Sequence, residues 1–149
     1  MKVLIFGCGR TGAALARMLS KSGHEVTIIE RDPKALIRLG HDHGCKTIIG
    51  DGLDEDVLKK AGIESSDAFI TCTRGDNSNL MAAQIAKVKF KVPKICVKVN
   101  DPTRAAEYTK IGLYCITPNL LTAGMMFSWL LDENYQTIEN YNAIKYNKG

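Results

Sequence analysis

Short apolar runs alternate along the chain with longer segments whose apolar positions recur every three or four residues. The short runs, such as VLIF near the start and VTII shortly after it, are typical of strands buried on both faces of a sheet. The longer segments, such as 11–22, carry alanine, leucine and methionine on one face and are typical of amphipathic helices. This alternation predicts an α/β protein with a parallel sheet.

We expect six strands with helices between and after them. The strands are expected at 2–6, 25–30, 46–49, 68–73, 95–99 and 113–116, and the helices at 11–22, 33–43, 54–61, 76–90, 102–111 and 119–131. Asp32 and Pro33 are a typical cap and first residue for the second helix. Right-handed crossovers then place helices on both faces, which predicts a Rossmann-like, doubly wound, six-stranded parallel sheet.

The expected domain covers residues 1–132, and 133–149 form a polar, tyrosine-bearing tail. The segment NAIKY at 142–146 is compatible with an additional edge strand. The helix at 119–131 is apolar on much of its circumference, so it must be buried somewhere. Two places remain open for it: a partner subunit, or the chain's own sheet.

Three glycines follow the first expected strand in the spacing G-x-G-x-x-G: Gly7, Gly9 and Gly12. In a strand–turn–helix context, the first glycine permits the tight turn and the second lets the backbone approach a pyrophosphate. The third lets helix and strand pack closely. The N-terminus of the following helix attracts phosphates, and Arg10 adds a positive charge. The pattern predicts a dinucleotide or nucleotide site.

An acid closes the second expected strand, as ribose recognition requires. Glu30 is suited to accept hydrogen bonds from ribose hydroxyls and to repel a 2′-phosphate, which disfavours NADP. The neighbouring Arg31 partly offsets that repulsion. Asp51, which follows the third strand, is a candidate to read the adenine amino group.

The loop after the fourth expected strand, TRGDNSN at 73–79, lies at the same edge of the sheet. Thr73 and Asn79 are candidates either to bind the ligand or to hold the loop. Asp76 has two equally supported roles, ligand binding and capping of the helix that it begins.

Composition narrows the function classes. The 149 residues carry a net charge of +4 and 7% aromatic residues, so the basic segment KVKFKVPK is read as a solvated helix end and no nucleic acid is expected. No run is long and apolar enough to span a membrane, and no secretory signal is present, which predicts a cytoplasmic protein. The five cysteines contain no C-x-x-C pair and are expected to be buried, reduced thiols.

Catalytic machinery is not apparent. The histidines His24, His41 and His43 lie away from the predicted cleft, and H-D-H places its two rings on different helix faces, so we expect neither a catalytic residue nor a metal site. We therefore predict that the protein is not an enzyme. The alternatives are the dinucleotide-binding half of an NAD-dependent oxidoreductase, and a scaffold or nucleic-acid binder that uses the basic segment.

The motifs GCGRTG, the acid at Glu30, GDG at 50–52, AFITCTRGDNSNL, ICVKVNDP and ITPNL together resemble one family. It is the nucleotide-binding RCK or KTN (TrkA-N) domain of the cytosolic regulators of Trk/Ktr potassium uptake. The resemblance runs in order over residues 1–132. It implies a regulatory subunit that binds NAD(H) or ATP/ADP, with AMP in the same class, and gates potassium transport by conformational coupling.

The resemblance also implies partners and site residues. The partners are a potassium-translocating membrane subunit and further copies, as a dimer or an octameric ring at the inner face of the membrane. The candidate binding residues are Gly7, Cys8, Gly9, Arg10, Thr11, Gly12, Glu30, Arg31, Asp51, Gly52, Leu53, Thr73, Arg74 and Lys98.

Two features depart from the family pattern. Lys98 stands where many members have arginine, which leaves NAD(H) and ATP/ADP both open. The usual C-terminal ligand-binding domain is missing, so we expect either a truncated chain or a short subunit that assembles with a longer one.

Overall fold

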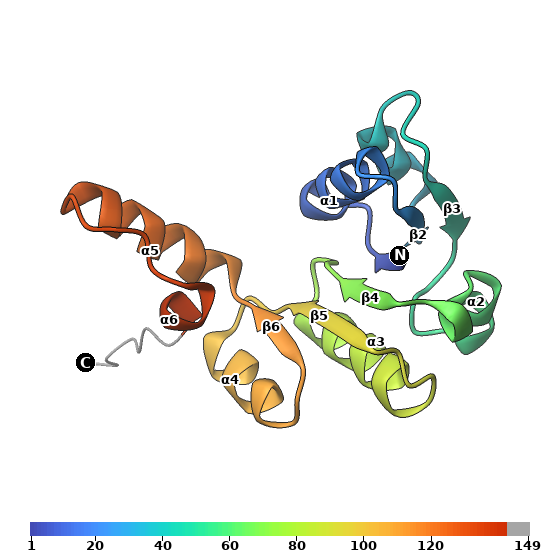
Figure 1. The fold of residues 1–149 in the computed structure, drawn as a ribbon. Coiled ribbons are helices and arrows are strands. Elements are labelled where there is room, and N and C mark those ends of the chain that lie inside the picture. The colour runs from blue at the N-terminus through green and yellow to red at the C-terminus, as the bar shows by residue number, and fades with distance from the viewer. Residues whose placement is uncertain (143–149) are drawn as a thin grey trace.

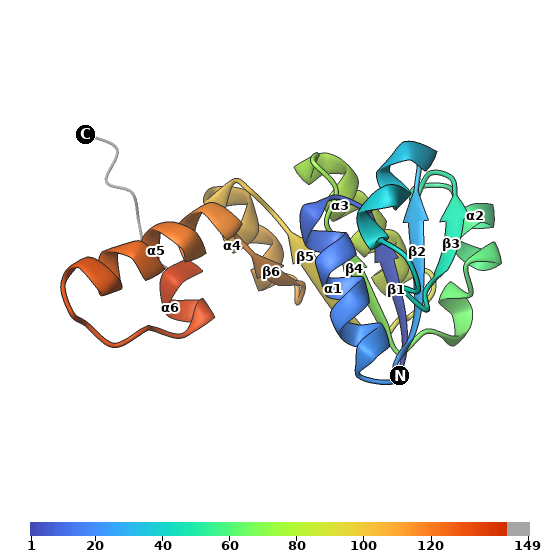
Figure 2. The same ribbon diagram turned by 90° about the horizontal axis from the view of Figure 1, so that it is seen from above.

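The computed structural model describes residues 1–142, in which six parallel strands alternate with helices (Figures 1 and 2). The strands are β1 (Lys2–Phe6), β2 (Glu25–Glu30), β3 (Lys46–Ile49), β4 (Ala68–Thr71), β5 (Lys94–Lys98) and β6 (Tyr114–Ile116). The α-helices are α1 (Arg10–Lys21), α2 (Glu55–Lys60), α3 (Asp76–Val88), α4 (Pro102–Lys110), α5 (Pro118–Leu130) and α6 (Ile138–Asn142), and two 3-10 helices are η1 (Pro33–Leu39) and η2 (Ile63–Ser65).

The strand order is β3-β2-β1-β4-β5-β6, with every neighbouring pair parallel. The chain winds outward from β1 in one direction as far as β3, then returns to β4 and winds outward in the other direction. This order confirms the Rossmann-like, doubly wound α/β fold predicted from the alternating pattern. The order reverses between β1 and β4, which leaves a crevice at the carboxyl ends of these strands.

Successive residues of β1 face opposite layers of the protein. Val3 and Ile5 pack in one cluster with residues of α1 and η1, whereas Leu4 and Phe6 pack in a second cluster with residues of α2, η2 and α3. A third cluster joins α3 and α4 to β5 and β6. Because both faces of the central strands are covered, these strands are apolar at nearly every position.

The segment that follows β2 is shorter and tighter than predicted. Asp32 caps it through its carboxylate, as expected, by accepting a hydrogen bond from the backbone N–H of Lys34 at 3.0 Å. However, the helix is of the 3-10 type and ends at Leu39, not His43. Gly40 adopts a φ of +76°, which terminates the helix because glycine takes this conformation without a steric penalty.

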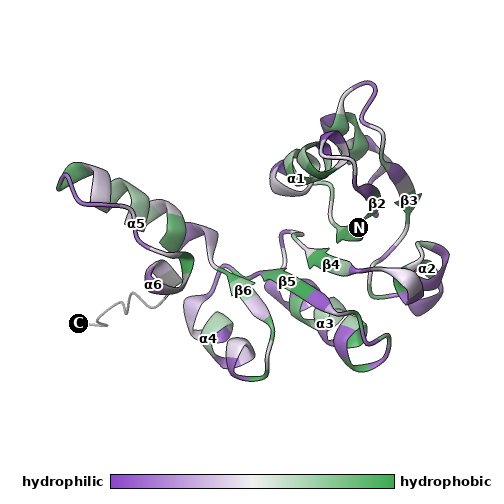
Figure 3. Ribbon diagram, in the orientation of Figure 1, coloured by the Kyte–Doolittle hydropathy of each residue, from purple (hydrophilic) through white to green (hydrophobic). Residues whose placement is uncertain are grey.

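Helix α5 extends away from the sheet and packs against α6 (Figures 1 and 2). Leu120, Gly124 and Ser128 form its buried stripe, and a Cβ at Gly124 would lie 2.2 Å from the ring of Tyr141. Figure 3 shows that apolar residues extend along the rest of this helix. The exposed members are Met125, Met126, Phe127, Trp129 and Leu130. Packing of this helix on its own sheet, one of the two alternatives, is therefore wrong.

Three further expectations concern the C-terminal segment, membrane-spanning helices and the cysteines. The expected edge strand at 142–146 lies almost wholly outside the described residues, and Asn142 ends α6 instead. Within residues 1–142, no helix combines the length and apolarity that a membrane crossing needs. All five cysteines are free thiols, of which Cys8, Cys72 and Cys115 are buried.

Candidate functional site

The loops that follow β1, β2, β3 and β4 meet at one edge of the sheet, where the strand order reverses. The backbone N–H of Gly7 donates to the carbonyl of Ile29, and that of Gly50 donates to the carbonyl of Glu30. These bonds continue the β1–β2 and β2–β3 ladders beyond the last paired residues. The glycine loop, the acid and the GDG loop are therefore neighbours in space, as their positions after successive strands predict.

The three glycines of the loop have different physical roles. Gly7 adopts a φ of +107°, a conformation that other residues rarely take. A Cβ at Gly12 would lie 2.0 Å from the carbonyl oxygen of Gly7, so this position has no room for a side chain. Both glycines are required by the protein's own packing.

Gly9 is different, because its own backbone and packing do not require glycine. Its φ of −72° and ψ of −172° suit any residue, and a Cβ there would meet no heavy atom of residues 1–142 within 4 Å, apart from its neighbours along the chain. It is the N-cap of α1, and no side chain caps the helix or places an acid in its first turn. The first N–H groups of this helix thus lack a side-chain cap and lie beside a position with room for a further group, an arrangement that suits a phosphate. Arg10 and Thr11 beside it are exposed.

The carboxylate of Glu30 is held by three backbone N–H groups. It accepts hydrogen bonds from Cys8 at 2.7 Å, from Arg31 at 2.8 Å and from Asp32 at 3.1 Å. Glu30 therefore links the glycine loop to the turn after β2. A carboxylate has about four lone-pair sites, so acceptor capacity remains for ribose hydroxyls.

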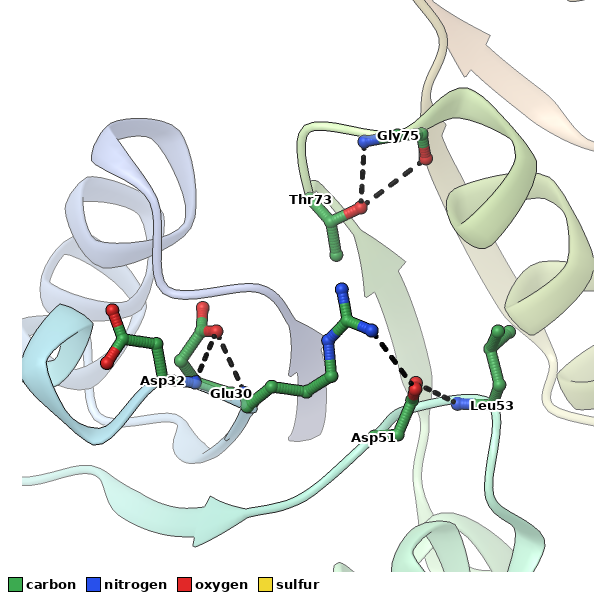
Figure 4. Close-up of polar contacts among 7 residues, drawn as sticks. Glu30, Asp32, Asp51, Leu53, Thr73 and Gly75 are labelled. Carbon is green, nitrogen blue, oxygen red and sulfur yellow. Dashed lines mark hydrogen bonds and ion pairs between the residues drawn. The ribbon is translucent and has the colours of Figure 1, made fainter.

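Arg31 and Asp51 join the ends of β2 and β3. Arg31 Nη1 lies 3.4 Å from Asp51 Oδ2, and Asp51 Oδ1 accepts a hydrogen bond from the backbone N–H of Leu53 at 3.0 Å. Figure 4 shows Asp51 and Thr73 on loops that face each other, with Glu30 to one side. Gly52 is buried, and a Cβ there would lie 2.5 Å from the ring of Phe6. Packing alone thus explains the glycine at that position.

Asn79 holds the loop after β4, the second of its two expected roles. Its side chain is fully buried, and its Oδ1 accepts hydrogen bonds from the backbone N–H of Thr73 at 2.9 Å and from the Thr73 hydroxyl at 2.8 Å. Its amide donates to the carbonyl of Lys98 at 2.9 Å. Asn79 therefore ties the end of β4 to the end of β5. The Thr73 hydroxyl is close to Gly75 as well (Figure 4).

Asp76 does not cap the helix that it begins, because Gly75 is the N-cap. Its carboxylate accepts hydrogen bonds from the backbone N–H groups of Asn100 and Asp101 and from the Asn100 side chain, at 2.9–3.0 Å. Asp76 thus anchors the loop between β5 and α4. Sequence reasoning missed Asn100, which carried no signal apart from its place after a strand.

Two basic candidates lie on the β4 and β5 side of the site. Arg74 is exposed in the loop after β4, and Lys98 is half-buried at the end of β5. Neither side chain has a hydrogen bond or ion pair among the described residues. Both ammonium and guanidinium groups are therefore free to meet an anionic ligand.

Two buried thiols lie under the glycine loop. Burial raises the pKa of Cys72 to about 12, and burial followed by the Glu30 charge raises that of Cys8. The Cys72 thiol lies 3.4 Å from the carbonyl oxygen of Gly7. Both groups are thus neutral at physiological pH and act as packing side chains beneath the loop.

A separate hollow of about 450 Å³ lies at the opposite edge of the sheet, near the amino ends of β1, β2 and β3. Its lining includes Lys2, Lys46 and Lys60. Ligands of open α/β sheets bind outside the carboxyl ends of the strands. We therefore place the candidate site at the glycine loop and not in this hollow.

Comparison with known proteins identifies relatives of the chain. Residues 3–118 match the family model described as the TrkA-N domain. A Trk system potassium uptake protein TrkA from Streptomyces coelicolor is 41% identical over 131 residues, which cover 88% of this chain and 59% of that protein. The chain thus spans less than two thirds of that relative's length.

Solved structures share the fold. The C-terminal domain of Shewanella denitrificans Kef, in an AMP-bound form, has a TM-score of 0.73 at 22% identity, covering 95% of this chain and 89% of that one. A GsuK channel bound to NAD has a TM-score of 0.68 at 19% identity, covering 83% of this chain and 22% of that one. The match to the family model over most of the residues, together with this fold, shows that the chain belongs to the TrkA-N domain family.

Proposed function

We propose that the chain is the nucleotide-sensing regulatory domain of a Trk/Ktr-type potassium uptake system and binds an adenine nucleotide, NAD(H) or ATP/ADP, with AMP in the same class. The observation that carries this proposal is the open space at Gly9, in front of the uncapped N-terminus of α1. It supports phosphate binding because neither the backbone conformation nor the packing of the described residues requires glycine there. The relatives named as Trk potassium uptake proteins support the potassium system, and the AMP-bound Kef domain and the NAD-bound GsuK channel, which share the fold, support the ligand class.

The proposed role is regulation without turnover. Among the described residues, no histidine lies on the loops around Gly9, and the carboxylates there are held by backbone N–H groups. Nucleotide binding then acts by differential affinity: it shifts the protein toward whichever conformation binds the nucleotide more tightly. The residues proposed to bind are the glycine loop, Glu30, Arg31, the GDG loop with Leu53, Thr73, Arg74 and Lys98.

The proposed partners are further copies of the chain and a potassium-translocating membrane subunit. Met126, Trp129 and Leu130 of α5 are 67%, 72% and 70% exposed, although this helix is strongly apolar. Contiguous exposed apolar surface marks an interaction site. We propose that this surface pairs with another copy, as a dimer or within an octameric ring, at the cytoplasmic face of the membrane.

The first test identifies the nucleotide. Mass spectrometry of the denatured, purified protein reveals any ligand that copurifies. Calorimetric titration of the stripped protein with NADH, NAD, ATP, ADP and AMP then gives the affinities. Saturable binding without turnover supports the proposal. Failure to bind any of the five, or oxidation of NADH coupled to reduction of a substrate, contradicts it.

A further inference from the structure

The Arg31–Asp51 ion pair lies next to the acid proposed to bind ribose. One oxygen of Asp51 accepts from the Leu53 N–H at 3.0 Å, while the other lies 3.4 Å from Arg31 Nη1. Asp51 is thus held by its own turn, and the long Arg31 side chain reaches over to it. Within residues 1–142, Asp51 is the one acidic side chain that contacts this guanidinium.

Arg31 follows Glu30 directly, yet its guanidinium does not pair with it. Arg31 contacts the Glu30 carboxylate through its backbone N–H alone, which donates a hydrogen bond at 2.8 Å. The other two donors to Glu30 are also neutral backbone groups. Among the described residues, no cation forms an ion pair with Glu30, so no such pair neutralises the carboxylate that is proposed to repel a 2′-phosphate.

An arginine close to the ribose acid is the group that accommodates a 2′-phosphate in NADP-binding sites of this fold type. Arg31 has the right position in the chain for that role, and its pairing with Asp51 draws it toward β3 instead. We propose that Asp51 is a specificity-determining residue: by holding Arg31 away from Glu30, it makes the site select adenosine nucleotides with a free 2′-hydroxyl. This inference rests on the proposed nucleotide binding.

The size of the effect follows from the exposure of the pair. The side chains of Arg31 and Asp51 are 67% and 36% exposed. Exposed ion pairs are weak because solvent and salt screen them. Release of Arg31 is therefore expected to change selectivity by about fivefold, not by orders of magnitude.

The test uses two ligands that differ only in the 2′-phosphate, AMP and adenosine 2′,5′-bisphosphate. Their dissociation constants are measured by calorimetry for the wild type, Asp51→Asn, Arg31→Ala and the double variant. Asparagine keeps the oxygen that accepts from Leu53 N–H and removes the charge. Asp56→Asn is the matched control, since Asp56 also pairs with a cation, Lys59, at 3.9 Å, but on helix α2.

We expect Asp51→Asn to reduce the preference for AMP about fivefold in the wild-type background and less than about twofold in the Arg31→Ala background. The Asp56→Asn variant is expected to leave the preference unchanged. An equal reduction in both backgrounds would show that Asp51 acts through its own charge and would overturn the inference. So would an unchanged preference in Asp51→Asn. If the wild type binds neither these ligands nor NADH or ATP, the proposed function itself fails, and the inference fails with it.

Discussion

The backbone N–H of Cys8 donates a 2.7 Å hydrogen bond to the carboxylate of Glu30. This bond connects the loop proposed to hold phosphates with the acid proposed to hold ribose. Glu30 also accepts from the N–H groups of the two residues that follow it. The shape of the candidate site and the position of its acid are thus coupled, so substitution of Glu30 is expected to affect stability as well as binding.

Glu30→Ala removes the acceptor of three backbone N–H groups. We expect the free energy of unfolding to fall by about 1–3 kcal/mol, chiefly because the N–H of the buried Cys8 loses its partner and carries a desolvation cost. We also expect nucleotide affinity to fall by more than about tenfold, which corresponds to about 1.4 kcal/mol. Glu30→Arg, which replaces a ribose acceptor by a bulky donor, is expected to weaken binding at least as much.

Urea unfolding and calorimetry measure these two effects. Glu25→Ala serves as the control, because Glu25 lies exposed at the other end of the same strand. Equal stability of the Glu30→Ala and Glu25→Ala variants would mean that the three hydrogen bonds contribute nothing net. Undiminished nucleotide affinity in folded Glu30→Ala would remove Glu30 from the site.

Substitutions at Gly9 and Gly12 are expected to affect different properties: nucleotide affinity at Gly9 and stability at Gly12. Gly9→Ala is expected to fold with nearly unchanged stability, since its Cβ meets no protein atom within 4 Å and its backbone suits alanine. Its methyl group occupies the space proposed for phosphate, so nucleotide affinity is expected to fall at least about tenfold. Gly12→Ala is the contrasting variant, because its Cβ would lie 2.0 Å from the Gly7 carbonyl oxygen.

Thermal melts and calorimetry of both glycine variants test this contrast. We expect Gly12→Ala to lose stability by about 1–3 kcal/mol or more, as overpacking against a backbone atom forces the chain to move. Wild-type affinity in Gly9→Ala would indicate that phosphate does not approach this part of the loop. Valine at the same position then provides a larger probe of the same space.

Self-association is expected to depend on α5. Met126→Glu places a charge on the exposed apolar face of that helix and is expected to shift the protein toward monomer. Met18→Glu on α1 is a matched control, since Met18 and Met126 are 66% and 67% exposed. Sedimentation of the two variants and the wild type over a range of concentrations measures the fraction of monomer in each. If both variants associate like the wild type, another surface holds the copies together.

Alkaline pH is expected to destabilise the protein through Cys72. Burial raises the pKa of this thiol from 9.0 to about 12, so between these values the unfolded chain binds fewer protons than the folded one. Stability therefore falls as pH rises above about 9, by up to about 1.4 kcal/mol per pH unit from this group.

Urea unfolding at pH 8, 9 and 10 tests the expected slope. Cys72→Ala is expected to flatten the decline above pH 9, whatever its effect on absolute stability. Cys45→Ala is the comparison, because Cys45 is only half-buried. A decline of the same steepness in Cys72→Ala would assign the alkaline sensitivity to other groups.

Local patterns along the chain determined the fold class. The continuous apolar strands reflect burial on both faces, and the Asp32–Pro33 cap depends on the adjacent backbone alone. The strand–glycine–helix arrangement around Gly7, Gly9 and Gly12 is also local, and it predicts where the crevice lies. These features could be read from the sequence because each depends on residues that are neighbours in the chain.

Contacts between segments far apart in the chain decided the roles of individual loop residues and the position of the last long helix. The sequence by itself determined the alternating elements, the glycine loop and the acid at the end of β2, since spacing and residue type specify them. Only the tertiary structure showed that Asn79 ties β4 to β5 and that the Phe6 ring leaves no room for a side chain at position 52. It also showed that α5 leaves the sheet and exposes its apolar side. The physical reason is that hydrogen-bond partners and steric neighbours far away in the chain are set by packing, which spacing along one segment does not encode.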